Sequence, residues 1–187
     1  MGRTAIILSV LIAATQILPV QALSGDDLSG TDKVAIRGAT EEQAASLTWA
    51  IERFDVSGLE LPALDLYVHG TKVGCDGHDG LYTPGTGSDR IDICTEAVFI
   101  ILHELAHAWE YRFGTDEARQ QLLDELGLEA WTGADVSYRR RGEEVAANVV
   151  AWGLIARDLT EPEADRSADT LERFEALTGV PSPRLTD

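Results

Sequence analysis

Basic residues are scarce in this chain of 187 residues. Its 15 lysines and arginines stand against 32 aspartates and glutamates, which gives a formal net charge of −17. Proteins that bind nucleic acid or anionic membranes concentrate lysine and arginine on their surface. The composition therefore counts against both kinds of partner, and the excess of negative charge is typical of a highly soluble surface.

Long apolar stretches are also scarce, and the one candidate lies at the N-terminus. It runs from Ala5 to Val20 behind a single positive charge at Arg3, and Val20-Gln21-Ala22 fits the small-x-small cleavage pattern. The stretch is short for a membrane span of about 20 apolar residues. The pattern predicts a signal peptide over residues 1–22, cleaved near Ala22, and a secreted protein with no membrane partner in its mature form. An uncleaved anchor is the alternative.

Cysteine occurs only twice, as Cys75 and Cys94. An even number of cysteines in an exported chain indicates a disulfide. The bond would tie the ends of a glycine-rich loop and so restrict the unfolded chain. Neither cysteine belongs to a CxxC pair, so we expect no zinc site built on them.

The remaining sequence predicts one α+β domain, because its length allows one substantial core and is short for two. Residues 23–39 are polar and glycine-containing, typical of a mobile lead-in to a domain at 40–180, and 181–187 form a tail. Thr40 and Gln43 have the spacing of a capping box at the start of a helix. Periodic patterns predict helices at 40–54, 95–113, 116–126, 143–157 and 163–177, strands at 64–69 and 89–94, and a loop at 75–88.

One motif carries chemistry: His103-Glu104-Leu105-Ala106-His107 is an HExxH sequence on a predicted helix. Residues four apart lie on one helix face, so both imidazoles can reach the same metal ion. Zinc accepts imidazole and carboxylate ligands and lowers the pKa of a bound water towards 7. Glu104 could then act as general base towards that water and as general acid towards a leaving amine.

The alternative is an accidental HExxH, which usually falls on a polar helix or a loop. This motif instead interrupts a stretch, 97–108, that is otherwise almost wholly apolar. Burying two histidines and a glutamate costs several kcal/mol unless something pairs with them. One bound Zn²⁺ ion would supply that partner.

The motif resembles that of the zincin metallopeptidases. It is not continued as in metzincins, because Glu110 and Phe113 stand where that group has glycine and histidine. Glu144-Val145-Ala146-Ala147-Asn148 resembles the gluzincin arrangement, in which a glutamate on a second helix is the third zinc ligand. Thermolysin-like enzymes place a carboxylate four residues later to orient a ligand histidine. The resemblance implies a zincin-like domain with Glu144 as a ligand and Asn148, uncharged here, as the orienting partner.

Residues 75–155 together resemble a family of small exported bacterial metallopeptidases. A second resemblance competes for the third ligand. Asp135-Val136-Ser137-Tyr138 partly matches the GTxDxxY motif of deuterolysin-like aspzincins, although Thr132-Gly133 reverses the order of the first two residues. It implies Asp135 as the alternative ligand, which is otherwise a solvated loop residue. Tyr138 is the candidate donor to a developing oxyanion.

We therefore expect a secreted zinc metallopeptidase that hydrolyses peptide or protein substrates. Zincins bind extended substrate along an edge strand, and the short strand that ends at Cys94 is the candidate. A non-catalytic, metal-stabilised binding or effector module is one alternative, and it would not need Glu104. A zinc hydrolase acting on a non-peptide amide is another. The pattern carries no signal for an oligomeric state.

Overall fold

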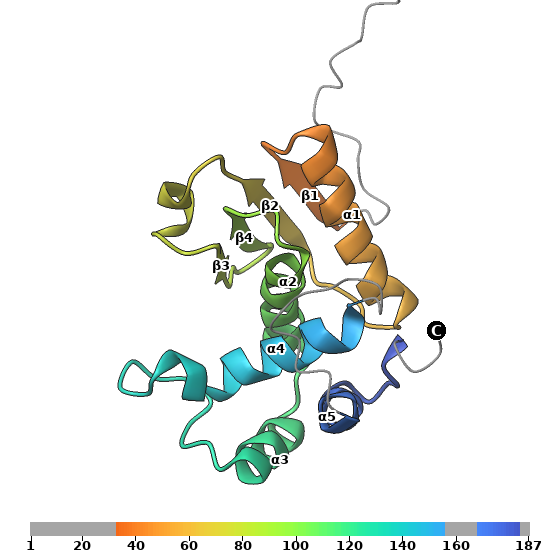
Figure 1. Ribbon diagram of the computed structural model, residues 1–187, viewed down its shortest axis with the longest axis vertical. Coiled ribbons are helices and arrows are strands. Elements are labelled where there is room, and N and C mark those ends of the chain that lie inside the picture. The colour runs from red at the N-terminus through yellow and green to blue at the C-terminus, as the bar shows by residue number, and fades with distance from the viewer. Residues whose placement is uncertain (1–32, 156–167, 184–187) are drawn as a thin grey trace, which may run out of the picture.

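The strands of the computed structural model, which describes residues 33–155 and 168–183, form one mixed sheet in the order β1-β2-β4-β3 (Figure 1). The parallel strands are β1 (Val34–Arg37), β2 (Leu64–Val68) and β4 (Asp89–Ile93). The fourth strand, β3 (Gly80–Thr83), pairs antiparallel with β4 and forms an edge of the sheet. The helix α1 (Glu41–Val56) makes the crossover from β1 to β2 that parallel strands require.

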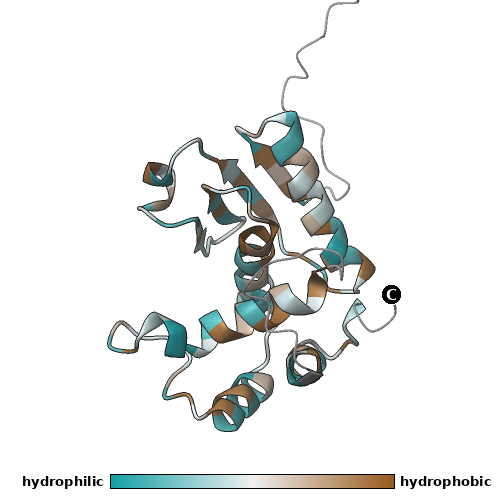
Figure 2. Cartoon of the chain, viewed as in Figure 1, coloured by the Kyte–Doolittle hydropathy of each residue, from teal (hydrophilic) through white to brown (hydrophobic). Residues whose placement is uncertain are grey.

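One face of the sheet is apolar and is covered by helices. Leu64 and Leu66 of β2 and Ile91 and Ile93 of β4 are buried in a core shared with α1 and with α2 (Val98–Phe113). α2 runs through the centre of the molecule, and Figure 2 shows it as one of the most hydrophobic segments. A helix that is apolar on most of its faces belongs in a core, and the polar residues His103, Glu104 and Glu110 of α2 are buried there.

The second half is helical. Three helices follow α2: α3 (Asp116–Leu126), α4 (Gly142–Leu154) and α5 (Ala168–Thr178). A short 3₁₀ turn, η2 (Tyr138–Arg140), precedes α4, and another, η1 (Lys72–Cys75), lies in the first half of the chain. α4 crosses and packs against α2, and its Ala146, Ala147 and Ala151 are fully buried (Figure 1). These small side chains allow the two helices to approach closely, which brings residues of α4 up to α2.

The structure confirms the α+β class and most of the predicted elements. Thr40 caps α1 in the predicted capping box with Gln43, and α3 has the predicted bounds and ends at Gly127 in the left-handed conformation, with φ 60°. The predicted disulfide between Cys75 and Cys94 is present. Within the described residues, no helix is long and apolar enough to cross a membrane. The predicted signal peptide at 1–22 lies outside the described residues.

Four predictions about the strands and helix ends are wrong. The lead-in predicted at 23–39 contains β1, and the loop predicted at 75–88 contains β3. The strand ending near Cys94 is not an edge, because β4 lies between β2 and β3. α2 begins at Val98 rather than at Thr95, whose hydroxyl instead accepts a hydrogen bond from the backbone N–H of Ala97. Strands as short as β1 and β3 have too few residues for an alternating pattern to show.

An ion pair between the buried Asp89 and the more exposed Arg112 fixes the connection between β3 and β4 to the end of α2. Asp89 is 1% exposed, and its carboxylate accepts hydrogen bonds from Arg112 Nε at 2.9 Å and from the backbone N–H of Gly85 at 2.8 Å. The Tyr82 hydroxyl donates to it at 3.2 Å. Burial alone would raise the pKa of Asp89, but the bonds from Arg112 and Gly85 outweigh it and hold the pKa below its usual value.

Arg112→Ala should therefore lower the free energy of unfolding at neutral pH, because it leaves the buried Asp89 carboxylate without its cation. Arg37→Ala is the matched control, since Arg37 pairs with Asp65 at the surface, where an ion pair contributes little, and it should lower the free energy of unfolding less. Urea denaturation of both variants measures the difference. Equal losses in the two variants would contradict the importance of the Asp89–Arg112 pair.

The effect of Arg112→Ala should shrink in acid. A lowered pKa in the folded state means that Asp89 stabilises the protein above the ordinary aspartate pKa of about 3.9 and loses that contribution as the pH falls below it. Wild type and variant should converge in stability as the pH falls from about 3.9 through the lowered pKa of Asp89. A constant difference across that range would argue against an ionised Asp89.

Candidate metal centre

The two histidines of the HExxH motif converge on one point. His103 and His107 lie one turn apart on α2, their Nε2 atoms are 3.0 Å apart, and their rings are nearly perpendicular, at 89°. Two nitrogen ligands at the usual zinc distance of about 2.0–2.1 Å lie roughly 3.3 Å apart in a tetrahedral site. The observed spacing suits either a hydrogen bond between the rings or a shared metal ion.

Glu144 reaches the same point from α4. Its Oε2 atom lies 3.3 Å from Nε2 of His103 and 3.4 Å from Nε2 of His107. Glu144 is 8% exposed, and within the part of the chain that the structure describes its Oε2 atom has no hydrogen-bond partner. A buried carboxylate oxygen without a partner is costly. The three ligand atoms all lie within 4.8 Å of one another, so this group could hold a metal ion.

The electrostatics of the group favour a cation. Burial alone would raise the pKa of Glu144, but its interactions with His103 and His107 prevail and hold that pKa well below the usual range. Burial lowers the pKa of His107. An ionised carboxylate and neutral imidazoles are the protonation states in which these residues bind metals.

Asn148 takes the orienting position that the sequence predicted. Its Oδ1 atom lies 3.0 Å from Nδ1 of His103, one helical turn beyond Glu144 on α4. The oxygen can only accept, so Nδ1 of His103 carries the proton and its Nε2 has a free lone pair. This contact thereby selects the imidazole tautomer that can bind a metal through Nε2.

Removing this contact should weaken metal binding without destroying the site. Asn148→Ala is expected to lower the affinity for zinc about 10- to 100-fold, because the His103 ring loses its fixed tautomer and orientation. Asn148→Asp is the matched control, since it keeps an acceptor at the same position and should preserve or raise the affinity. Competition against a chromophoric chelator measures both. An alanine variant that binds zinc as tightly as the wild type would refute the role.

Glu104 lies beside the group in a nearly closed environment. It is 7% exposed, and mainly because of burial its pKa rises to about 7. The charge of His103 and a hydrogen bond from the backbone N–H of Tyr82 lower the pKa of Glu104, whereas the charge of Glu144 raises it further. A carboxyl group with a pKa near neutrality can both accept and return a proton there.

The edge strand β3 packs directly on Glu104. A Cβ atom at Gly80 would lie 2.5 Å from Oε1 of Glu104, so only glycine fits at this position without moving the carboxylate. In the antiparallel register with β4, Asp79 and Leu81 are the hydrogen-bonded residues, whereas the backbone groups of Gly80 and Tyr82 face the free edge. The sequence analysis missed this strand, although Leu81-Tyr82-Thr83 between glycine and proline is a short signal for one.

Tyr138 and Asp135, the other residues singled out in the sequence, lie differently. Burial and a hydrogen bond with Glu144 raise the pKa of Tyr138, so its hydroxyl stays protonated beside the ligand group. Asp135 is exposed and is not among the three residues that could hold a metal. The structure therefore brings Glu144, and not Asp135, to the two histidines.

Aromatic rings support both imidazoles, and the sequence analysis did not anticipate them. Tyr82 of β3 lies nearly parallel to His107, with ring centroids 6.2 Å apart and planes at 12°. Phe99 lies 6.2 Å from His103 and packs on Trp152 at 4.3 Å. These contacts restrict ring rotation and so help to keep both Nε2 atoms directed at one point.

No family model, curated protein or solved structure matches the chain.

Proposed function

We propose that this protein is a secreted zinc metallopeptidase of the gluzincin type, with His103, His107 and Glu144 as ligands and Glu104 as general base. The observation that carries the proposal is the buried Oε2 atom of Glu144, which faces Nε2 of both histidines and has no hydrogen-bond partner among the described residues. The donor set of two imidazoles and one carboxylate is one that catalytic zinc sites use, with the fourth position left open. The disulfide is consistent with an exported protein.

The residues around the group have the properties that amide hydrolysis requires. When bound, zinc supplies a water of lowered pKa and polarises the substrate carbonyl. Glu104 lies next to the ligands with a pKa of about 7, so it can take a proton from that water and return it to the leaving amine. The protonated hydroxyl of Tyr138 can donate a hydrogen bond to the developing oxyanion.

The free edge of β3 favours an extended peptide as substrate. A peptide strand that added to this edge would pair with the backbone of Gly80 and with the carbonyl of Tyr82, whose N–H is directed to Glu104. A hydrolase for non-peptide amides would have no use for such an edge. A non-catalytic metal-binding module would not require a buried carboxyl group beside the ligands, which otherwise only costs stability.

Metal analysis combined with a hydrolysis assay tests the proposal. We expect about one zinc ion per purified chain, and cleavage of an unstructured protein such as casein that stops when a chelator removes the metal and resumes when zinc is restored. A chain that binds no zinc, even after reconstitution, would overturn the proposal. One zinc ion without hydrolysis of any peptide would leave the binding module as the better account.

A further inference from the structure

The strand β3 is short and paired on one side only, yet it lies against Glu104. It has four residues and pairs with β4 alone. Such an edge strand frays easily, because few backbone hydrogen bonds hold it. Any displacement of β3 moves Gly80, which touches the Glu104 carboxylate, and Tyr82, whose backbone N–H hydrogen-bonds to it. The position of Glu104 therefore depends on what holds β3 in place.

β3 is held at both ends, and the bond at its beginning is covalent. After β3, the buried Asp89, paired with Arg112, binds the backbone N–H of Gly85 and the Tyr82 hydroxyl. Before β3, the Cys75–Cys94 disulfide joins η1 to the residue that follows β4, and the backbone N–H of Cys94 donates to the Asp79 carbonyl at 2.8 Å. Cys75 is fully buried. Only four residues separate the disulfide from the start of β3.

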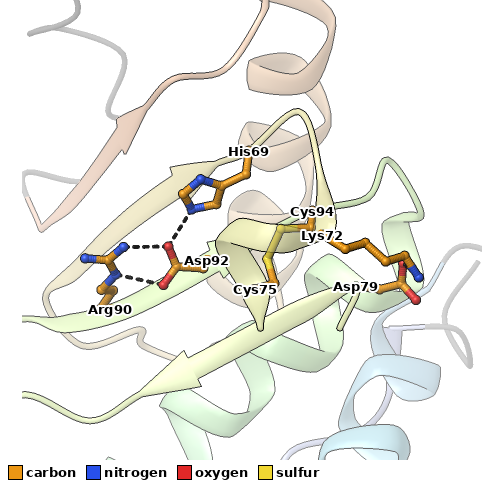
Figure 3. The surroundings of a disulfide bond; sticks show 7 residues. All are labelled: His69, Lys72, Cys75, Asp79, Arg90, Asp92 and Cys94. Carbon is orange, nitrogen blue, oxygen red and sulfur yellow. Dashed lines mark hydrogen bonds and ion pairs between the residues drawn. A yellow bond between two sulfur atoms is a disulfide. The ribbon is translucent and has the colours of Figure 1, made fainter. Parts of the chain in front are cut away.

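The strand β4, which ends just before Cys94, is also held by contacts that do not involve the disulfide, as Figure 3 shows. His69, just after β2, places its Nε2 atom 2.6 Å from Oδ1 of Asp92, and Arg90 binds the same carboxylate through two contacts of 2.7 Å. The backbone N–H of His69 also donates to the Ile93 carbonyl at 2.8 Å. Without the disulfide, β4 would remain attached to β2, and the freed segment would be the one that leads into β3.

We infer that the Cys75–Cys94 disulfide is a positioning element for Glu104 that acts through β3, an inference that rests on the proposed function. The bond fixes the start of β3, β3 presents Gly80 and the Tyr82 N–H to Glu104, and Glu104 is thereby held beside the metal ligands. Neither cysteine contributes an atom to the metal centre. The disulfide thus affects proton transfer by Glu104 and leaves metal binding unchanged.

The test is the double variant Cys75→Ala/Cys94→Ala, studied by amide hydrogen exchange and by hydrolysis. Exchange at Leu81 and Tyr82 should accelerate at least roughly tenfold, while amides of α2 and α4 keep their wild-type rates. Zinc content should stay at about one per chain, and kcat should fall roughly 100-fold, the loss that a misplacement of about 1 Å can cause. In a Glu104→Gln background the same cysteine substitutions should cost no further activity.

Two other variants separate positioning from general effects. Gly80→Ala keeps the disulfide but places a Cβ atom where Glu104 now lies, so it should reproduce the loss in kcat with zinc retained. Lys72→Ala removes the exposed Lys72–Asp79 ion pair of the same loop, which is 2.8 Å long, and should change neither exchange nor hydrolysis.

Three outcomes would contradict the inference. Unchanged exchange at Leu81 and Tyr82, or full activity in the cysteine variant, would overturn it, and so would global unfolding, because the bond is assigned a local role. The exchange measurement needs no substrate. If the wild-type protein hydrolyses nothing, the proposed function fails, while the exchange data still report whether the disulfide holds β3.

Discussion

Glu144→Ala is expected to yield a purified protein without stoichiometric zinc, whereas Asp135→Ala should retain about one ion per chain. The variant keeps His103 and His107 but loses the buried carboxylate whose Oε2 atom lies 3.3 and 3.4 Å from their Nε2 atoms. Two imidazoles without the charged third ligand bind zinc far more weakly. The loss of affinity should therefore exceed the roughly 10- to 100-fold expected for Asn148→Ala, which removes only an outer contact.

Elemental analysis after dialysis against a weak chelator measures this difference directly. Asp135→Ala is the matched control, since it removes the exposed carboxylate that a second sequence resemblance offered as a ligand. Glu144→Gln checks that the result reflects charge and not volume, and circular dichroism checks that each variant folds. If Glu144→Ala kept its full zinc content and Asp135→Ala lost it, Asp135 would be the third ligand. The segment before α4 would then have to be arranged differently.

Glu104→Gln should separate catalysis from metal binding. The amide has nearly the size of the carboxyl group that fits under Gly80, but it cannot accept the proton of a metal-bound water. We expect kcat/KM for peptide hydrolysis to fall about 10²- to 10⁴-fold, the usual contribution of a general base, with about one zinc ion retained. That range corresponds to about 2.7–5.4 kcal/mol of transition-state stabilisation.

The control for this variant is another buried glutamate of α2. Glu110 is 5% exposed and pairs with Arg119, and neither residue belongs to the ligand group. Glu110→Gln should lower the stability of the protein but leave kcat/KM close to the wild-type value. If Glu104→Gln kept its activity, a different group would have to move the proton. If it lost its zinc, Glu104 would have a role in binding the metal.

The sequence determined the features that depend on near neighbours along the chain. The four-residue spacing of His103 and His107 places them on one face wherever a helix forms, so two of the three members of the ligand group followed from periodicity alone. The same holds for the capping box of Thr40 and Gln43 and for the end of α3 at Gly127. The pairing of Cys75 with Cys94 followed because the chain has no third cysteine.

Only the tertiary structure decided which distant residues meet. Glu144 and Asp135 were both compatible with the sequence, and the packing of small alanines of α4 against α2 brings Glu144 to the histidines. Asn148 lies 45 residues after its partner His103. The edge strand was assigned to the wrong segment because pairing between strands depends on long-range register, which a four-residue strand such as β3 does not reveal in its own sequence. Periodicity is a local property of the backbone. Separate elements must pack together to bring the third ligand to the histidines, Gly80 to Glu104, and Arg112 to Asp89.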